Sequence, residues 1–572
     1  MVNPVVFVLG ASALPLARTL KAELGGEIHT PDCVAGGDVH YPKATAHLAK
    51  LFQEQRPIIG LCASGILIRA IGPHLNDKFS EPPVIAVAED GSSAVPLLGG
   101  HHGANDIARR IAEIAGGHAA ITTASDVVFG RAFDEPDEGI VLANPQHMKS
   151  ATSAKLSGHE VRVETTEHVV QGGPAHLVYH PRTLVLGLGS ERNAPAAEMI
   201  ALAEQCLSAQ NLSPASVAFV VSIDLKSDEA AIHATARHFK VPARFFTAEE
   251  LNAEAPRLKN PSAIVAKEVG TPGVAEAAAL AGAGPEAALI VEKTKSARAT
   301  CAIAKAPKPI LDPAGKPQGV LHVIGIGPGT KDWRAPAAAH ALSMAEDWVG
   351  YGLYLDLVQD LKQPDQTEHR FPLGGEEDRV RHAIALAKQG RTVALICSGD
   401  AGIYAMAALV YELLDLEPCR IRVEVIPGIS AFQAAAAKAG AMIGHDFCCI
   451  SLSDLLTPWE VIERRVKAAA EGDFVISFYN PRSLKRRDQL ERAFAILAKH
   501  RPPETPVIIA SNLGRPEEQV KIVDFSDFNP EDVDMLTLVM VGSSQSKSFA
   551  RGDGQTYAYT PRGYAKKREA AE

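Results

Sequence analysis

The stretch VLHVIGIGPG, Val320 to Gly329, decides the fold of the second half of this chain. The apolar run 320–324 predicts a buried parallel strand, and the glycines and proline of 325–329 predict a sharp turn directly after it. The Ala-rich run from Pro336 to Trp348 predicts the helix that returns along the strand. A Pro-, Gly- and Lys-rich seam, Ala304 to Gly319, precedes the strand, and such seams join separately folded bodies. We therefore expect a new α/β unit to begin at Val320, with a glycine-rich ligand loop as its first turn.

Composition sets the broad class of protein. The chain has 572 residues, of which 46% are hydrophobic and 22% are charged, so we expect several domains with ordinary cores. The net charge of −10 argues against nucleic acid or an anionic membrane as a partner. The eight cysteines form no CxxC pair, which favours a reducing cytosol over a disulfide scaffold or a zinc knuckle. The first residues, MVNPVVFVLG, predict a core strand rather than a signal peptide, and we expect a soluble, cytoplasmic protein.

Residues 4 to 126 alternate short apolar strands with helical stretches, which predicts a parallel sheet covered by helices. We expect strands at Val5–Leu9, Ile58–Cys62, Val84–Val87 and Ala119–Thr122, and helices near Leu14–Leu24, Ile66–Ile71 and Asn105–Ala115. Ligands bind beyond the carboxyl ends of the strands in such sheets. Three loops at strand ends are therefore candidates: Ala63 to Gly65, Glu89 to Gly91, and Gly99 to Asn105.

The last of these loops, GGHHGAN, is the most informative of the three. It stands directly before a helix whose free N–H groups are able to receive a carboxylate. The alternative is a helix cap at Asn105 with ordinary turn glycines. The paired histidines His101 and His102 suggest a metal, but no third ligand has suitable spacing, so we expect no metal site.

Residues 182 to 305 return to an α/β pattern, after a less regular module at 127 to 181. The motifs of the first half are SGILIRAIGPHLNDK, AVAEDG, GGHHGAND, ITTASD, LGLGSERNAP, SIDLKSDE, VGTPGVAEAAAL and LIVEKTKSA. Together they resemble the cobalt-precorrin-5A hydrolase family of cobalamin biosynthesis over residues 4 to 305. The resemblance implies the opening of a δ-lactone on a corrinoid precursor, with Asp90, His101, His102 and Asn105 as candidate site residues. Ser190 stands where many relatives have cysteine, so we assign no nucleophile there.

In the second half, small or polar loops follow a series of apolar strands. We expect strands at Val320–Ile324, Thr392–Cys397, Ile421–Ile426, Asp473–Phe478 and Pro506–Ala510, followed by loops at 325–329, 398–404, 427–431, 479–483 and 511–514. Small residues let the backbone approach a ligand, so these loops predict a binding cleft. The run GIGPGT lacks the sixth glycine of the dinucleotide fingerprint. Asp400 among the glycines favours a polar or cationic ligand over a polyphosphate.

The runs HVIGIGPG, VGYGLYLDL, CSGDAGIYAMA, EVIPGISAFQAAAAKAGAMIGHDF and FYNPRSLKR resemble the tetrapyrrole (corrin/porphyrin) methyltransferase family, most closely its members that methylate precorrin-3B at carbon 17. The similarity extends from Val320 to about Phe549, with Ala401 where many relatives carry proline and Ala335 where many carry threonine. It implies a homodimer that binds S-adenosylmethionine between two α/β domains and contracts the macrocycle during methylation. It also implies cofactor contacts at Pro328, Gly399, Asp400, Ile403, Ser430, Ala431, Asn480 and Leu513.

Methyl transfer from a sulfonium requires chiefly that the protein align the reactants and exclude water. A proton acceptor would assist ring closure, and Tyr479, Asp400 and His445 are the candidates. Arg482 is a candidate for binding a substrate carboxylate, because arginine forms paired hydrogen bonds with such groups. The alternative for Arg482 and the basic residues after it is a solvated face on a helix over Leu484–His500.

We therefore expect a multidomain α/β protein: hydrolase-like corrinoid domains followed by a two-domain α/β tetrapyrrole methyltransferase. The expected divisions are 1–126, 127–181, 182–305, a linker at 306–319, methyltransferase subdomains at 320–430 and 431–550, and a tail at 551–572. The expected function is S-adenosylmethionine-dependent methylation of precorrin-3B at carbon 17, fused to a lactone-hydrolase-like half. Two alternatives stay open: a cobalt-containing macrocycle, cobalt-factor III, as the substrate, and a first half that carries a corrinoid without catalysis.

Overall fold

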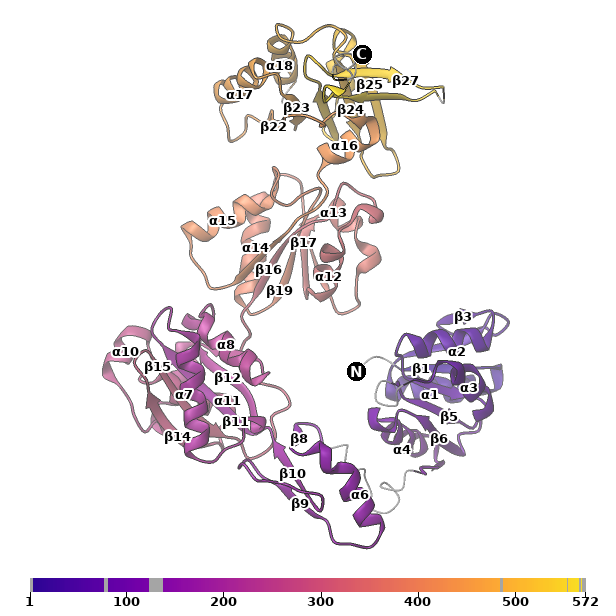
Figure 1. The fold of residues 1–572 in the computed structure, drawn as a ribbon, viewed down its shortest axis with the longest axis vertical. Helices are drawn as coiled ribbons and strands as arrows, with labels where there is room; N and C mark the ends of the chain where they lie inside the picture. Colours follow the sequence, from indigo (N-terminus) through magenta and orange to yellow (C-terminus); the bar gives the residue numbers. More distant parts are fainter. Residues whose placement is uncertain are drawn as a thin grey trace.

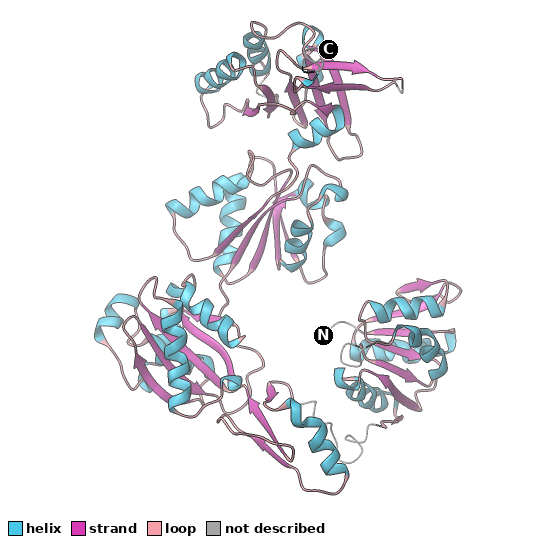
Figure 2. Ribbon diagram, viewed as in Figure 1, coloured by secondary structure: helices cyan, strands magenta, loops and turns pink. Residues whose placement is uncertain are grey.

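The computed structural model describes residues 4–76, 81–122, 137–483, 487–552, 554–564 and 567. Figure 1 shows successive α/β bodies along the chain, and Figure 2 shows that helices flank the strands within them. The predicted multidomain α/β class is confirmed. The expected division at residues 126 and 127 lies outside the described residues. Among the described residues, no helix has both the length and the apolar character needed to cross a bilayer.

The first body contains a seven-stranded sheet of order β3-β2-β1-β4-β5-β6-β7. Its elements are β1 (Val5–Val8), α1 (Leu14–Leu24), β2 (Glu27–Pro31), β3 (Val39–Tyr41), α2 (Ala44–Gln53), β4 (Ile58–Leu61), α3 (Ser64–Ile71), β5 (Val84–Val87), β6 (Ser93–Leu98), α4 (Ala104–Ala115) and β7 (His118–Ala119). Strands β1 to β5 run parallel to one another. The strands β2, β3 and β6 and the helix α2 were not among the expected elements.

The expected parallel sheet is confirmed for β1 to β5, but β6 runs antiparallel to β5. Leu98, at the end of β6, pairs with Val84, at the start of β5. A Cβ atom on Gly99 would lie 2.7 Å from the backbone of Pro83, the residue before β5. The loop Gly99 to Asn105 therefore begins at the edge of the sheet where β5 starts. The loop Glu89 to Gly91 follows β5 and lies at the opposite edge.

Two further bodies lie between this sheet and Val320. The first has the sheet β8-β10-β9, and the second has the sheet β13-β12-β11-β15-β14. The elements are β8 (Ile140–Leu142), α6 (Met148–Leu156), β9 (Arg162–Thr165), β10 (His176–Pro181), β11 (Leu184–Ser190), α7 (Ala196–Ala209), β12 (Val217–Ile223), α8 (Ala230–Phe239), β13 (Ala243–Phe246), α9 (Ala248–Asn252), α10 (Ala263–Val269), α11 (Val274–Ala283), β14 (Ala288–Lys295) and β15 (Ala299–Lys305). Helix α11 packs closely on β11 at Gly187, which has no side chain. A Cβ atom there would lie 1.9 Å from the carbonyl oxygen of Ala275.

The body that begins at Val320 has a parallel sheet of order β18-β17-β19-β16-β20. Its elements are β16 (Val320–Gly325), α12 (Pro336–Met344), β17 (Asp347–Tyr351), α13 (Gly352–Asp356), β18 (Thr367–Phe371), α14 (Glu376–Lys388), β19 (Thr392–Cys397), α15 (Met406–Leu416) and β20 (Arg422–Ile426). The predicted helix through Trp348 is wrong at its end. Helix α12 stops at Met344, and Trp348 is a fully buried residue of β17 whose indole N–H donates to the carbonyl of Leu342 (3.0 Å).

The last body has the mixed sheet β22-β23-β26-β24-β25 and a small sheet β21-β28-β27. Its elements are α16 (Ala431–Ala439), β21 (Gly440–Ala441), β22 (Phe447–Ser451), α17 (Trp459–Glu471), β23 (Val475–Tyr479), α18 (Gln489–Leu497), β24 (Pro506–Ser511), β25 (Gln519–Asp524), β26 (Thr537–Val541), β27 (Lys547–Ala550) and β28 (Thr556–Tyr559). Strand β26 runs antiparallel to both β23 and β24, with Thr537 opposite Ser511. The amino end of β26 therefore shares an edge with the carboxyl ends of β23 and β24. Strand β28 lies within the segment expected to be a tail.

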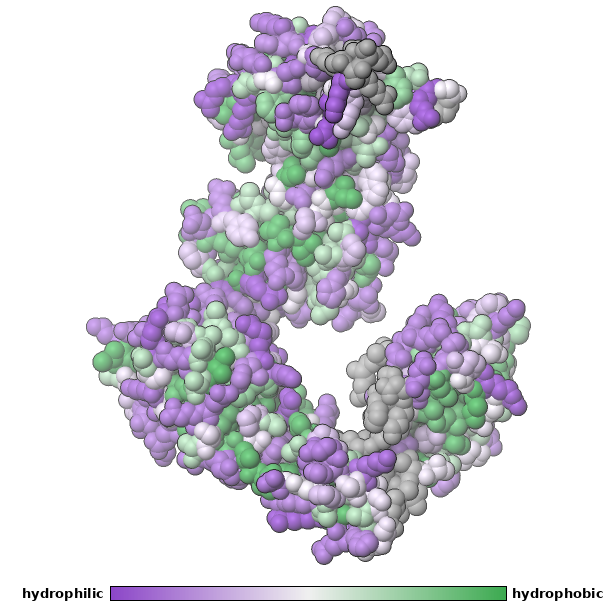
Figure 3. Space-filling view, viewed as in Figure 1, coloured by the Kyte–Doolittle hydropathy of each residue, from purple (hydrophilic) through white to green (hydrophobic). Residues whose placement is uncertain are grey.

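Hydrophilic residues cover much of the face of the molecule shown in Figure 3. The apolar residues instead form separate cores on the faces of the individual sheets, with one cluster on β16 and α12 and another on α16 and β24. These two bodies thus bury separate cores.

Candidate functional site

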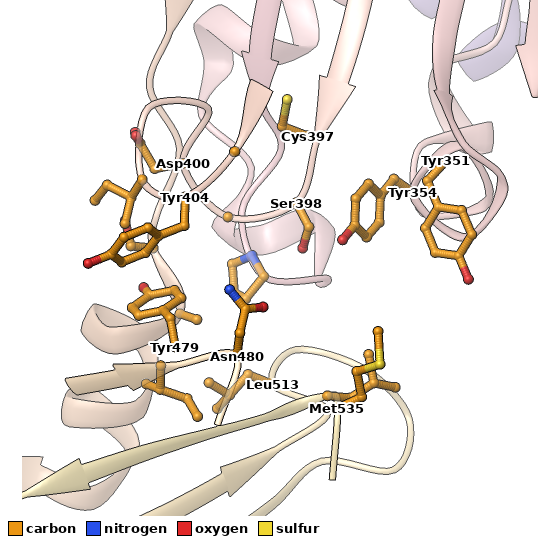
Figure 4. A pocket seen from close by; sticks show the side chains of 18 of the residues that line it. Tyr351, Tyr354, Cys397, Ser398, Asp400, Tyr404, Tyr479, Asn480, Leu513 and Met535 are labelled. Carbon is orange, nitrogen blue, oxygen red and sulfur yellow. The ribbon is translucent and has the colours of Figure 1, made fainter. Parts of the chain in front are cut away.

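A cavity of about 300 Å³ lies between the loops of the parallel sheet that begins with β16 and those of the mixed sheet that follows. This volume is at the lower end of the range for small-molecule sites, roughly 300–1,000 Å³. Figure 4 shows Tyr404 and Tyr479 at one side of the cavity and Tyr351 and Tyr354 at the other, with Ser398 between them. Loops from both sheets line this cavity, so its two opposite walls come from different bodies.

The glycine loops of the parallel sheet meet backbone to backbone. The N–H of Gly327 donates to the carbonyl of Gly399 (3.1 Å), and the N–H of Gly399 donates back to the carbonyl of Gly327 (2.8 Å). A Cβ atom on Gly428 would lie 2.2 Å from the oxygen of Gly399, and one on Gly325 would lie 2.7 Å from the same oxygen. Gly399 also has a φ of +66°, which side chains rarely adopt. These contacts leave no room for side chains where the three loops converge.

A further close contact joins the two bodies that enclose the cavity. A Cβ atom on Gly329, in the first loop, would lie 2.6 Å from the carbonyl oxygen of Gly514, in the loop after β24. The two glycines therefore let loops from different sheets touch directly. The side chain of Arg515, which lines the cavity, packs beside this contact, with its Cγ 2.9 Å from the same Cβ position.

Asp400 ties the second glycine loop to the third. One carboxylate oxygen accepts a hydrogen bond from the N–H of Gly402 (2.8 Å), and the other accepts one from the N–H of Gly428 (3.1 Å). Hydrogen bonds to an ionised group are stronger than those between neutral groups. Because both oxygens are engaged, the geometry favours a role for Asp400 in holding the loops over the role of proton acceptor.

Tyr404 and Tyr479 form one wall of the cavity, with ring centroids 5.2 Å apart. The hydroxyl of Tyr404 donates to the carbonyl of Cys449 (2.8 Å), and the hydroxyl of Tyr479 accepts from the N–H of Phe432 (3.2 Å). Burial raises the pKa of both phenols above the ordinary value for tyrosine. Tyr479 therefore stays protonated at neutral pH, which argues against it as the proton acceptor.

Three residues that line the cavity have left-handed backbone conformations although none is glycine. Tyr404, Asn480 and Asn512 have φ values of +51°, +49° and +52°. A bulky residue such as tyrosine is rare in this region, and strained conformations of this kind cluster at functional sites. The side-chain amide of Asn480 donates to the hydroxyl of Ser451 (3.1 Å), which links the loop after β23 to the end of β22.

The structure brings most of the sequence-predicted residues of the second half together. The predicted residues that line the cavity are Pro328, Gly399, Asp400, Ile403, Ser430, Ala431, Tyr479, Asn480 and Leu513. Ser430 and Ala431 lie at the start of α16, where the Ser430 side chain and Gln433 form a capping box.

Two predicted residues do not line the cavity. His445 has an exposed side chain, and its Nδ1 lies 3.3 Å from a carboxylate oxygen of Asp446. The guanidinium of Arg482 donates to the carbonyl of Pro530 (2.7 Å) and pairs with Glu531 (2.6 Å). These contacts do not support the hypothesis that Arg482 binds substrate, because its guanidinium holds the 530–531 turn instead. The basic residues Lys485 and Arg486 that follow it lie outside the described residues.

Sequence reasoning missed several residues of the cavity. They are Tyr351, Tyr354, Glu376, Arg379, Arg515 and Met535. Tyr351 is the last residue of β17, and Tyr354 lies in α13 directly after it. The helix predicted through Trp348 overlaps the start of this strand and hides its carboxyl end. Met535 precedes β26, and only knowledge that β26 is antiparallel would have placed it at this edge.

The candidate residues of the first half do not form one cluster. Asp90 follows β5, and its carboxylate accepts a hydrogen bond from the N–H of Ser92 (3.0 Å). Hydrogen bonds from the side chain and then the backbone of Ser92 lower the pKa of Asp90. Asn105 is 2% exposed in the first turn of α4, and His102 is exposed in the preceding loop. The side chain of His101 lies outside the described part of the structure. Because Asp90 and the 99–105 loop lie at opposite ends of β5, the side chains of Asp90 and Asn105 do not converge on one point.

Three family models match separate parts of the chain. The model described as Tetrapyrrole (Corrin/Porphyrin) Methylases matches residues 320–529, Cobalamin synthesis G C-terminus matches residues 184–304, and Cobalamin synthesis G N-terminal matches residues 46–126. The two cobalamin synthesis G segments thus precede the methylase segment, which supports the predicted fusion.

Curated relatives named as C(17)-methyltransferases match 43% of the chain. The chain is 47% identical over 245 residues to the probable cobalt-factor III C(17)-methyltransferase of Salmonella typhimurium, a match that covers 43% of this chain and 99% of the relative. It is 40% identical over 250 residues to the precorrin-3B C(17)-methyltransferase of a Sinorhizobium species, covering 43% of this chain and 98% of the relative.

A third relative is the cobalamin biosynthesis protein CobIJ of Mycobacterium bovis, which is 42% identical over 250 residues. This match covers 43% of the chain and 48% of the relative, so the chain spans about half the length of that protein. Because the Salmonella and Sinorhizobium relatives are covered almost from end to end, the chain belongs to the tetrapyrrole (corrin/porphyrin) methylase family.

Proposed function

We propose that the second half of the chain transfers a methyl group from S-adenosylmethionine to carbon 17 of precorrin-3B, with contraction of the ring, in cobalamin biosynthesis. The observation that carries this proposal is the convergence of the glycine loops 325–329, 398–404 and 427–431 on one cavity. The names of the relatives with 40% and 47% identity support carbon 17 as the position of methylation.

The residues of the cavity fit the proposed donor. Gly399 and Pro328 offer close backbone approach, Ile403 and Leu513 offer apolar contact, and Asn480 offers a polar side chain. The rings of Tyr404 and Tyr479 add aromatic surface, which attracts cationic groups. When bound, S-adenosylmethionine supplies an electrophilic methyl group on a positively charged sulfur.

The protein contributes alignment rather than covalent chemistry to such a reaction. Asp400 fixes the second and third loops relative to each other, and Gly329 and Gly514 let the two bodies approach closely. The half-buried apolar residue Ile403 and the buried Leu513 help to exclude water. Correct placement of two reactants lowers the barrier of a bimolecular step by several kcal/mol, on the order of 7–11 in the best intramolecular reactions.

Product mass tests the proposal directly. The full chain is incubated with S-adenosylmethionine and, in parallel, with precorrin-3B or with cobalt-factor III. We expect precorrin-3B to gain the mass of one methyl group. A gain with cobalt-factor III alone would assign the chain to the cobalt-containing macrocycle named for the Salmonella relative. If neither macrocycle gains a methyl group, the proposed function is wrong.

For the first half we propose action on a corrinoid, since both of its matched segments carry cobalamin synthesis G descriptions. The candidate activity is hydrolysis of the δ-lactone of cobalt-precorrin-5A, and the rival role is that of a carrier. Incubation with cobalt-precorrin-5A separates them: release of acetaldehyde indicates hydrolysis, and pigment binding without release indicates a carrier. Absence of both would contradict a corrinoid role for this half.

A further inference from the structure

We propose that Arg379 and Arg515 form a carboxylate-binding end of the cavity, which takes the acid side chains of the tetrapyrrole substrate. This inference rests on the proposed function and adds the residues that recognise the substrate. Arg379 belongs to α14 in the first methylase body, and Arg515 belongs to the loop after β24 in the second. Both residues line the same cavity, so the two bodies each supply one guanidinium.

Each arginine has a buried donor with no acceptor. The Nε atoms of Arg379 and Arg515 are shielded from solvent and have no hydrogen-bond partner among the described residues. Arg379 as a whole is only 3% exposed, and the side-chain hydrogen bond that the structure shows for it runs from Nη2 to the carbonyl of Pro372 (3.3 Å). Burying a charged donor without an acceptor is costly, so such groups in native proteins are normally paired. The two orphaned Nε atoms therefore point to a missing acceptor.

The two guanidinium groups act on the same part of the cavity. Burial raises the pKa of Tyr354, and the positive charges of Arg515 and Arg379 both oppose that rise. Both arginines therefore lie within electrostatic range of the Tyr354 hydroxyl. Figure 4 shows Tyr354 and Tyr351 across the cavity from Tyr404 and Tyr479. The arginines therefore lie within reach of the Tyr354 side of the cavity, and Arg515 also packs on the first glycine loop, since its Cγ would lie 2.9 Å from a Cβ atom on Gly329.

Charge at this end favours an anion. Among the described lining residues the cationic side chains are Arg379 and Arg515, and the acidic ones are Glu376 and Asp400. The two carboxylate oxygens of Asp400 already accept hydrogen bonds from the N–H groups of Gly402 and Gly428, so Glu376 is the acidic group left to balance the two guanidinium groups. Arginine binds carboxylates through paired, charge-assisted hydrogen bonds, for which the free Nε is one of the required donors.

A carboxylate at this site has two possible sources. One is the set of acetate and propionate groups on the macrocycle, and the other is the amino-acid carboxylate of the methyl donor. The Tyr404–Tyr479 wall lies across the cavity from Tyr354. If this wall and the second and third glycine loops hold the donor, as in the proposed function, the side with Tyr354 and the arginines is left for the macrocycle. We therefore assign the arginines to the substrate.

Binding measurements on the full chain test this assignment. The probes are uroporphyrin, a metal-free porphyrin with acid side chains on every ring, its neutral amide derivative, and S-adenosylhomocysteine. We expect Arg515→Gln to weaken uroporphyrin binding by about tenfold to a hundredfold, the range for a charge-assisted hydrogen bond. The affinity for S-adenosylhomocysteine should change by less than about threefold, and the wild-type chain should prefer uroporphyrin to its amide.

Arg381→Gln is the matched control. Arg381 lies on α14, the helix of Arg379, but it is exposed and paired with Glu377 and Glu417 (both 2.8 Å). It should bind every probe like the wild type. Arg379→Lys, which keeps the charge but loses the Nε donor, should weaken uroporphyrin binding less than Arg379→Gln does. If Arg379→Gln fails to fold, Arg515→Gln carries the test alone.

Unchanged uroporphyrin binding by Arg515→Gln would overturn the proposal, as would a wild-type chain that binds no uroporphyrin. Loss of S-adenosylhomocysteine affinity instead would assign the arginines to the donor and would also overturn it. Failure of the proposed function gives a different result from failure of this inference. In that case the wild-type chain binds uroporphyrin through these arginines but methylates neither precorrin-3B nor cobalt-factor III.

Discussion

The glycine loop of the first body and the glycine loops of the methylase cavity look alike in sequence but lie in different surroundings. In the methylase half, the loops after β16, β19 and β20 follow parallel strands, so all three lie at one edge of the sheet and touch. In the first body, the loop Gly99 to Asn105 follows β6, which is antiparallel to β5. That loop is therefore separated from the loop Glu89 to Gly91 by the length of β5.

This difference shows that strand direction decides which loops can share a site. The same rule explains the residues before β26, which were not predicted. Thr537 begins a strand that is antiparallel to β24, so Met535 and Leu536 reach the edge where β24 ends. In an all-parallel sheet, the carboxyl ends of the strands are enough to predict which loops share a site. In a mixed sheet, the amino ends of antiparallel strands lie at the same edge and must be included.

The largest effect should come from separating the methylase loops. Gly428→Ala would place a methyl group 2.2 Å from the oxygen of Gly399, which is backbone and cannot move aside cheaply. We expect S-adenosylhomocysteine affinity to fall by more than about a hundredfold, and the free energy of unfolding to fall by about 1–3 kcal/mol. Calorimetric titration and chemical denaturation measure the two effects.

Gly352→Ala is the matched control, since a methyl group there would lie 3.7 Å from the nearest atom, a guanidinium nitrogen of Arg370. It should leave affinity and stability unchanged. Normal binding by Gly428→Ala would mean that the convergence of the loops is not required for the donor.

A smaller loss is expected when the link between two loops is cut. Asp400→Ala removes the acceptor for the N–H groups of Gly402 and Gly428. Each charge-assisted bond is worth about 1.5–3 kcal/mol, part of which is recovered when water replaces the carboxylate. We therefore expect Asp400→Ala to lower the affinity for S-adenosylhomocysteine about tenfold, as measured by calorimetric titration. The affinity of Asp400→Asn should lie between those of the wild type and Asp400→Ala. If Asp400 instead acts as the proton acceptor, Asp400→Asn would keep binding and lose turnover.

The amino end of β26 should contribute mainly to stability. The Thr537 hydroxyl lies 2.7 Å from the hydroxyl of Ser511 and accepts from the N–H of Asp534 (3.3 Å). Thr537→Val keeps the shape but removes the buried hydroxyl and its hydrogen bonds to the half-buried Ser511 and the exposed Asp534, so the free energy of unfolding should fall by about 1 kcal/mol. Thr537→Ser, which keeps the hydroxyl, should recover most of the loss in chemical denaturation. Equal losses in both variants would contradict the polar role of this edge.

The smallest effect is expected between the two edges of the first body. Strands rise about 3.3 Å per residue, so β5 alone separates Asp90 from the 99–105 loop by roughly 10 Å or more. Asp90→Ala and Asn105→Ala should therefore have additive effects on the free energy of unfolding, within about 0.5 kcal/mol. A double-mutant cycle in urea measures the coupling. A coupling well above 1 kcal/mol would mean that the two positions share a site after all.

Sequence reasoning found the strands of both halves that carry continuous apolar runs, and it found the glycine loops after them. It failed at Trp348, because the alanines before it continue a helical pattern, while burial against α12 decides that the residue lies in a strand. It also failed for Arg379 and Arg515, whose sequence neighbours are ordinary for surface residues. Their role depends on contacts between bodies, and no local periodicity encodes such contacts.

The central claim is that the cavity between the glycine loops and the mixed sheet receives the methyl donor. A crystal structure of the full chain with S-adenosylhomocysteine tests it most directly. We predict that the ligand lies between the loop at Gly399 and the side chain of Leu513, next to Asn480. Ligand bound outside this cavity, or a cavity filled by the chain's own side chains, would contradict the account.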